Sequence, residues 1–265
     1  MKASIIVFLA VISFGCATKE ERPDPLLKAL FTGDTHLVDM TYSLSLSAPY
    51  WPDPSGNPFH YDTLVKQPSG APAMGRYHIP EHFGTHLDAP IHSADQRASV
   101  DRLTPYELFG HAVVIDAREQ SKENPDYLLS KQDILNWEKW HGPIPSRAIV
   151  LMLTGWGEKW SNSPAYKNED EKGTMHFPGF SKEAAQMLAE ERDILGIGID
   201  TFSVDAAIAD GFPVHGIVNG AGKFHLENVA NLHALPPAGA FLIIAPIKLE
   251  GGSGGQVRIF GVLPN

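Results

Sequence analysis

The stretch from Glu81 to His92 contains four side chains that commonly bind metal ions, all within eleven consecutive residues. They are three imidazoles and one carboxylate, namely His82, His86, Asp88 and His92. Every interval between them is even, so on an extended chain all of these side chains point to the same side. Gly84 and Pro90 interrupt the stretch and argue against a continuous helix. Because this donor set suits Zn²⁺, Mn²⁺ or Fe²⁺, the sequence predicts a metal centre built on extended backbone.

The composition is that of an ordinary globular protein and narrows the choice of partners. With 265 residues, of which 43% are hydrophobic, the chain can bury one sizeable core without covalent cross-links. The 21 basic residues are outnumbered by 31 acidic ones, which gives a net charge of −10. Nucleic acid is therefore an unfavourable partner, since phosphate binding depends on lysine and arginine. The single cysteine, Cys16, excludes an intramolecular disulfide and a cysteine-rich zinc site.

Residues 1–17 have the pattern of a signal peptide. A mostly apolar stretch, Ala3–Phe14, is too short to cross a bilayer, because a spanning helix needs about 20 residues. The small residues Gly15–Ala17 follow, and two outcomes are open: lipidation of Cys16 as the first mature residue, or ordinary cleavage. Residues 18–36 are expected to form a polar tether. Either outcome predicts an exported, periplasmic protein, with or without a lipid anchor.

The rest of the chain alternates strands and helices. Strands are predicted over residues 38–47, 111–118, 147–154, 194–199, 239–248 and 256–263, and helices over 130–140, 181–192 and 215–223. Ser130 and Asp133 occupy the positions of a capping box at the start of the first helix. Residues 48–75 are rich in proline and glycine, which predicts a long functional loop. The alternation predicts a single α/β domain over residues 37–265, with a largely buried mixed sheet.

The metal-binding stretch, read as His-x-Gly-Thr-His-x-Asp-x-Pro-x-His, resembles the signature of the metal-dependent cyclase family. This family includes bacterial kynurenine formamidases and isatin hydrolases. The resemblance extends to Asp39–Thr41, Tyr50–Pro52, Pro213–His215 and Glu227–Leu232, and it covers about residues 37–263. It implies a swivelling β/β/α domain around a central mixed sheet, assembled as a homodimer or a homotetramer.

The resemblance also implies a ligand set for one or two zinc or manganese ions per chain. His82, His86 and Asp88 match the ligands of a first metal ion. Asp88 and Glu227 match residues that bridge to a second ion, which His215 completes.

Two further positions match residues that act on the substrate. His92 falls where the family places a proton-transfer histidine, and Trp51 falls where formamidases place an aromatic substrate contact. An unperturbed imidazole has a pKa of about 6.5, so His92 can accept and return a proton near neutral pH. His225 and His233 flank the second motif, and the resemblance assigns no role to either.

Together these residues predict a metal-dependent hydrolase of a C–N bond in a small aromatic amide or lactam. The main interpretation is a kynurenine formamidase-like (arylformamidase) activity on an aryl formamide or cyclic amide. One alternative is lactam opening by an isatin-hydrolase-like enzyme that uses manganese, and another is a metal-binding module without turnover. Extra sequence around residues 60–75 and 157–180, together with the export signal, is closer to the isatin hydrolases than to a compact formamidase.

Overall fold

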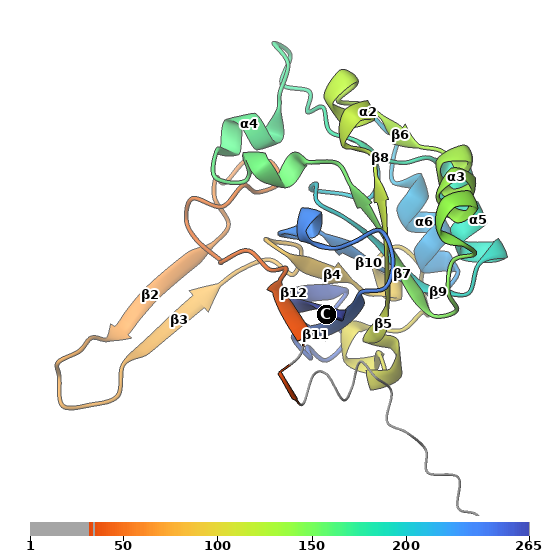
Figure 1. Ribbon diagram of the computed structural model, residues 1–265. Coiled ribbons are helices and arrows are strands. Elements are labelled where there is room, and N and C mark those ends of the chain that lie inside the picture. The colour runs from red at the N-terminus through yellow and green to blue at the C-terminus, as the bar shows by residue number, and fades with distance from the viewer. Residues whose placement is uncertain (1–31, 34, 265) are drawn as a thin grey trace, which may run out of the picture.

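The computed structural model describes residues 32, 33 and 35–264, and it contains one mixed sheet of eight strands (Figure 1). The strands lie in the order β1-β12-β11-β5-β7-β9-β10-β4. Their bounds are Thr35–Asp39 (β1), His86–Asp88 (β4), Phe109–Asp116 (β5), Ala148–Leu153 (β7), Ile194–Ile199 (β9), Phe224–Glu227 (β10), Phe241–Pro246 (β11) and Gly254–Pro264 (β12). Because β12 pairs with β4 as well as with β1 and β11, the sheet closes into a barrel-like arrangement.

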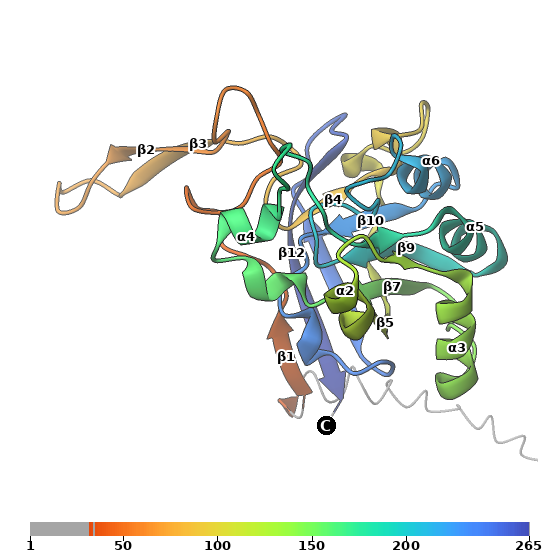
Figure 2. The ribbon, with the colours of Figure 1, turned by 90° about the horizontal axis from the view of Figure 1, so that it is seen from above.

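Helices and two small sheets surround the closed sheet. The helices are α2 (Arg118–Glu123), α3 (Lys131–His141), α4 (Ser163–Lys167), α5 (Lys182–Glu191) and α6 (Pro213–Gly220). Short 3-10 turns cover Pro90–His92, Val100–Arg102, Pro105–Glu107, Trp156–Lys159 and Leu232–Ala234. The small sheets pair β2 (His60–Val65) with β3 (Met74–His78), and β6 (Leu128–Leu129) with β8 (Gly179–Phe180). Helices α3, α5 and α6 lie side by side along one face of β5, β7 and β9 (Figure 2).

Alternate residues of the central strands enter two separate hydrophobic layers. In β7, Ile149 and Leu151 point into the closed sheet and pack with residues of β4, β10 and β12. Val150 and Met152 point the opposite way and pack against α3, α5 and α6. All of these side chains are completely buried. A continuous apolar run of this kind is expected for a parallel strand that is covered on both faces, and it makes β7 the buried centre of the fold.

Most of the predicted elements are present, with ends that differ by a few residues. Helix α3 begins after Ser130, whose hydroxyl accepts the Asp133 N–H while the Asp133 carboxylate accepts the Ser130 N–H, so the predicted capping box is confirmed. The prediction of a single mixed α/β domain is also confirmed. Closure of the sheet is a feature that the sequence did not indicate. The swivelling β/β/α arrangement stays a prediction.

The first predicted strand is shorter than expected. It ends at Asp39 instead of continuing to residue 47. Three residues later the Tyr42 N–H binds the Thr85 hydroxyl at 3.0 Å instead of a neighbouring strand. The chain therefore leaves the sheet here and turns toward the segment that precedes β4.

The proline- and glycine-rich region is not one long loop, as the sequence had suggested. Strands β2 and β3 form a hairpin that projects from the body of the molecule (Figures 1 and 2). Tyr61 pairs with Tyr77 across the hairpin, and Asp62 forms an ion pair with Arg76 at 3.4 Å. The prolines and glycines between residues 68 and 72 lie in the connection between the two strands. The predicted loop therefore extended over too long a segment.

The predicted leader and its cysteine, Cys16, lie outside the described residues, as does most of the predicted tether. Export, the lipid anchor and the tether therefore stay predictions. Within residues 32, 33 and 35–264, no helix combines the length and the apolar character needed to cross a membrane.

A close approach of β12 to β4 generates the first prediction. Gly254 lies opposite Asp88, and an added Cβ would come 2.6 Å from the Leu87 carbonyl and 2.7 Å from the His82 ring. Gly254→Ala should therefore lower the free energy of unfolding by about 1–3 kcal/mol and weaken metal binding by displacing His82. Urea unfolding and metal analysis measure the two effects.

The matched control is Gly216→Ala in α6, where a Cβ would meet nothing within 4 Å. This change should leave stability unchanged or raise it by up to about 1 kcal/mol, because alanine is the better helix former. Equal effects of the two substitutions would contradict the steric argument.

Candidate metal centre and active site

The pairing of β4 with β10 brings the two metal-binding motifs together. His86 lies opposite Glu227, and Asp88 lies opposite His225. Side chains alternate between the faces of a strand, so Leu87 and Leu226 enter the hydrophobic core inside the sheet. The four polar side chains consequently share the other face, although their motifs are about 140 residues apart in the sequence.

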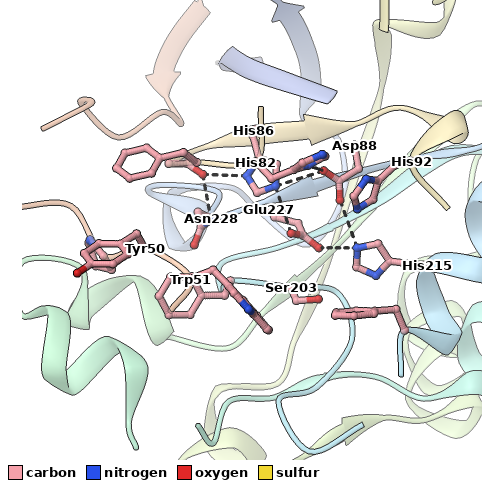
Figure 3. A pocket seen from close by; sticks show the side chains of 15 residues that line it. Tyr50, Trp51, His82, His86, Asp88, His92, Ser203, His215, Glu227 and Asn228 are labelled. Atoms are coloured by element: carbon pink, nitrogen blue, oxygen red, sulfur yellow. Dashed lines mark hydrogen bonds and ion pairs between the residues drawn. The ribbon is translucent and has the colours of Figure 1, made fainter. Parts of the chain in front are cut away.

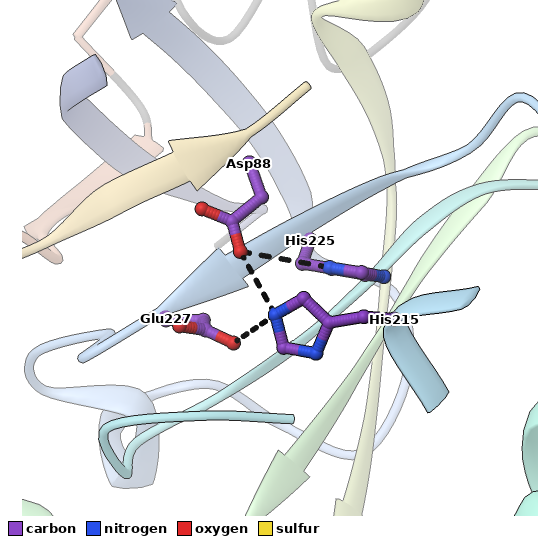
Figure 4. Close-up of side chains that lie close together, drawn as sticks. All are labelled: Asp88, His215, His225 and Glu227. Carbon is purple, nitrogen blue, oxygen red and sulfur yellow. Dashed lines mark ion pairs between the residues drawn. The ribbon is translucent and has the colours of Figure 1, made fainter. Parts of the chain in front are cut away.

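The two carboxylates each present their oxygens to two groups of histidines (Figures 3 and 4). Asp88 Oδ1 lies 2.6 Å from His82 Nδ1 and 3.2 Å from His86 Nε2, and Oδ2 lies 3.3 Å from His215 Nε2. Glu227 Oε2 lies 3.3 Å from His86 Nε2, and Oε1 lies 3.5 Å from His215 Nε2. All five predicted ligands are therefore brought together, in an arrangement that fits two bridged cations.

Neighbouring groups hold two of the imidazoles in a useful orientation. His86 Nδ1 lies 3.0 Å from the Gly84 carbonyl, to which it donates, so its Nε2 faces the carboxylates. His215 Nδ1 lies 2.7 Å from Asp205, which also accepts the backbone N–H groups of Val214 and His215 at the start of α6. Hydrogen bonds of this type fix the ring and its tautomer in metal sites.

The electrostatics of the metal-free centre call for positive charge. Burial lowers the pKa of His86, but Asp88 and Glu227 outweigh it and raise the pKa to about 10. Burial likewise lowers the pKa of His215, and hydrogen bonds to Asp205 and Asp88 raise it to about 10. Burial alone would raise the pKa of Asp88, yet the surrounding imidazoles hold it well below its usual range. In the metal-free centre, protonated imidazoles compensate the negative charges of the two carboxylates. A divalent cation would provide the same compensation, so the residues fit a metal.

His92 lies beside this centre, in the 3-10 turn that follows β4. Its ring centroid is 4.0 Å from that of His82 and 5.5 Å from that of His215. Burial is the main cause that lowers its pKa to about 4, and His82 and His215 add to the effect while Asp88 opposes it. A neutral imidazole can accept a proton. His82, Asp88 and His92 also place ligand atoms within 4.8 Å of one another, so the geometry alone fits a ligand as well.

A pocket of about 220 Å³ opens over the centre and has an aromatic wall (Figure 3). Trp51 is 43% exposed and lies on this wall. Three phenylalanines, Phe177, Phe202 and Phe212, surround its indole with ring centroids 6.1 to 6.4 Å away. The predicted substrate contact is therefore placed where a flat ring could lie beside the donor groups.

Sequence reasoning missed two residues of the centre. His225 had received no role, and no strand was predicted around it. In the structure it lies two residues before Glu227 on strand β10, which places both side chains on one face. Asp205 left no signal, because it lies ten residues before His215 and meets it only through the fold. His233, the other histidine without a role, is exposed and is not among the clustered donor groups.

Comparison with known proteins places the chain in one family. The family model Cyclase matches residues 38–206, and the chain belongs to this family of cyclase-like proteins. It is 36% identical to the isatin hydrolase of Roseibium aggregatum over 192 residues, which cover 69% of this chain and 72% of the relative. The structure of isatin hydrolase A from Ralstonia solanacearum superimposes with a TM-score of 0.83 at 37% identity, over 90% of this chain and 95% of that one.

A more distant match separates the two interpretations of function. The kynurenine formamidase of Salinibacter ruber is 25% identical over 226 residues, which cover 84% of this chain and 95% of the relative. The predicted family is thus confirmed, and its named relatives are hydrolases. The isatin-hydrolase alternative agrees with these relatives better than the arylformamidase interpretation does.

The position of the Asp88 carboxylate between the two groups of histidines generates a prediction about metal content. Asp88→Ala removes the oxygens that face both groups of histidines, and it should remove at least one metal equivalent and abolish hydrolysis. Elemental analysis of the purified variant measures the loss. Asp116→Ala, which breaks an exposed ion pair with Arg118, should keep the full metal content. Full occupancy in the Asp88 variant would contradict the ligand assignment.

The raised pKa values predict a pH-dependent stability of the metal-free protein. Below pH 6.5 the folded and unfolded chains both hold protons on His86 and His215, so the stabilisation is present in full. Between pH 6.5 and about 10 only the folded chain holds them, and stability should fall as the pH rises. Urea unfolding with chelator at pH 6.5 and 9 should differ by more than about 1.4 kcal/mol.

The metal-loaded protein is the control for this effect. Histidines that bind a metal do so as neutral imidazoles, so its stability should fall much less over the same pH range. A metal-free protein with the same unfolding free energy at both pH values would refute the electrostatic description.

Proposed function

We propose that this protein is a metal-dependent hydrolase that opens the C–N bond of a small aromatic lactam, as an isatin-hydrolase-like enzyme. The observation that carries the proposal is the position of His92. It contacts the donor groups from the pocket side, where a purely structural metal site would need no further imidazole. The family membership, the aromatic wall and the donor set support the same conclusion.

The roles follow from what each side chain faces. His82, His86, Asp88, Glu227 and His215 would hold the metal, and zinc and manganese both suit these ligands. When bound, such an ion polarises a carbonyl oxygen and lowers the pKa of water. His92 would take a proton from the attacking water and return it to the nitrogen as the C–N bond breaks. The oxygen of that water becomes part of the carboxylate of the opened product.

The aromatic wall would position the substrate for this attack. Trp51 and Phe202 meet nearly at right angles, with an interplanar angle of 83°. A fused aryl ring could pack against these faces, while its carbonyl group points toward His86 and Asp88. Both side chains line the pocket together with the donor groups, so the wall and the metal ligands face one space. This arrangement favours flat aryl carbonyl compounds over aliphatic amides.

Hydrolysis of an aryl formamide is a second candidate. The retention of His215 and Glu227, together with the match to a kynurenine formamidase, favours it. The two candidates differ in the substrate, since one opens a ring and the other releases formate. A metal-binding module without turnover is the remaining alternative, and it predicts no hydrolysis of either compound.

A substrate panel tests the proposal. Zinc- and manganese-loaded protein is assayed with isatin, N-formylkynurenine and an aliphatic lactam of similar size. We expect kcat/KM for isatin to exceed that for the other two by at least tenfold. A preference for N-formylkynurenine would transfer the assignment to the second candidate, and no turnover with any compound would leave the binding module.

His92→Ala tests the proton-transfer role. Fold and metal content should be unchanged, and the rate should fall roughly 10²–10⁴-fold, the usual effect of removing a positioned acid–base group. His92→Asn should rescue little, because an amide can donate a hydrogen bond but cannot carry the proton. Loss of metal in these variants would instead make His92 a ligand, and near-normal turnover would exclude it from the reaction. Exposed His141→Ala is the control.

A further inference from the structure

Four buried donor groups gather around the imidazole of His215. Asp88, His215, His225 and Glu227 are each at most 4% exposed, and one ligand atom from each lies within 4.8 Å of the others (Figure 4). The family resemblance accounts for three of these residues as metal ligands. His225 is not among them, and nothing in the reaction described above uses it.

The environment of His225 is unusual for a buried imidazole. Its side chain is fully buried, and within the described residues neither ring nitrogen has a hydrogen-bond partner. Burying a polar group without a partner is costly, so such groups in proteins are nearly always satisfied. Asp88 Oδ2 lies 3.6 Å from Nδ1, which is too far for a hydrogen bond. The position is thus unexplained by the protein atoms alone.

Each carboxylate directs one oxygen toward His86 and the other toward His215, and His225 lies on the His215 side. Asp88 Oδ1 and Glu227 Oε2 face His86, whereas Asp88 Oδ2 and Glu227 Oε1 face His215. The His215 side therefore has one oxygen from each carboxylate and the imidazole of His215. The ring of His225 lies 4.6 Å from that of His215, centroid to centroid, and supplies a second nitrogen there.

We propose that His225 is the fourth protein ligand of a second, inner metal ion, which Asp88, His215 and Glu227 hold with it. Two nitrogens and two oxygens complete a tetrahedral zinc-type site, and a site with four protein ligands is of the structural kind. The outer position is the one that His82 and His86 hold. Both residues line the pocket, as Asp88, His215 and Glu227 do, whereas His225 does not. The inference rests on the proposed function only in treating the outer position as the catalytic one.

Metal stoichiometry tests this inference without any substrate. The wild-type protein should bind two zinc ions per chain by elemental analysis and chelator titration. His225→Leu, which is close in size but has no donor atom, should retain one ion and bind the other at least 100-fold more weakly. The matched control, His233→Leu, removes an exposed histidine from the same segment and should keep both ions.

Cobalt substitution provides a second readout that needs no variant. Imidazole N–H protons on a ligand of paramagnetic Co²⁺ are shifted far outside the normal proton NMR range. The doubly loaded wild type should show a shifted N–H signal from His225 in addition to those of His82, His86 and His215. This measurement stays decisive if His225→Leu fails to fold.

Three results would overturn the inference. They are a single ion in the wild type, two equally tight ions in His225→Leu, and the absence of a shifted signal from His225. In the last two cases His225 would merely pack beside Asp88. Hydrolysis by a protein with any of these results would still leave the proposed function standing, so the two proposals fail independently.

Discussion

The structure depends on two carboxylates that are buried among histidines. Asp88 and Glu227 are almost inaccessible to water. In the pairing of β4 with β10, Asp88 lies opposite His225 and Glu227 lies opposite His86. Buried negative charges require compensation, and here imidazole nitrogens surround them at 2.6 to 3.6 Å. The raised pKa values of His86 and His215 express the same requirement, which a metal cation meets without protons.

The rest of the fold can be understood as support for that arrangement. Helix α6 presents His215 from outside the sheet, and Asp205 holds both the first turn of the helix and the imidazole. Strand β12 closes the sheet against β4, and the missing side chain at Gly254 leaves room for His82. The ligands therefore come from a turn, two strands and a helix that are each anchored in a hydrophobic layer. Such anchoring keeps donor atoms near their positions before a metal binds.

The donor groups of the centre differ in their access to solvent. His82 and His92 are half-buried and line the pocket, whereas His215 and His225 are buried. His215 also lines the pocket, whereas His225 does not, so His225 is the donor group that is set apart from the pocket. The aromatic wall around Trp51 lines the same pocket, so the groups proposed to bind substrate and to move protons share one space. The burial of His225 away from the pocket agrees with the structural position that we infer for it.

Much of the site was predictable because its ligands obey local rules. The even spacing from His82 to His92 predicted one extended segment. This is correct for His86 and Asp88 in β4 and wrong for His82, which lies in a bend, and for His92, which lies in a 3-10 turn. The apolar run of β7 and the capping box at Ser130 indicated their elements directly. These patterns depend on the alternation of strand side chains and on hydrogen bonds between near neighbours. The family resemblance then added His215 and Glu227, which local rules could not join to the first motif.

Only the tertiary structure decided which distant residues complete the centre. The register of β10 against β4 places His225 opposite Asp88, and the path of the chain before α6 brings Asp205 to His215. Closure of the sheet through β12 and the projecting β2–β3 hairpin were likewise not indicated by composition or periodicity. Strand register and chain closure depend on packing between segments far apart in the sequence. Residue types and spacing therefore determined the chemistry of the donors, and the fold determined how they are divided between two sides of one centre.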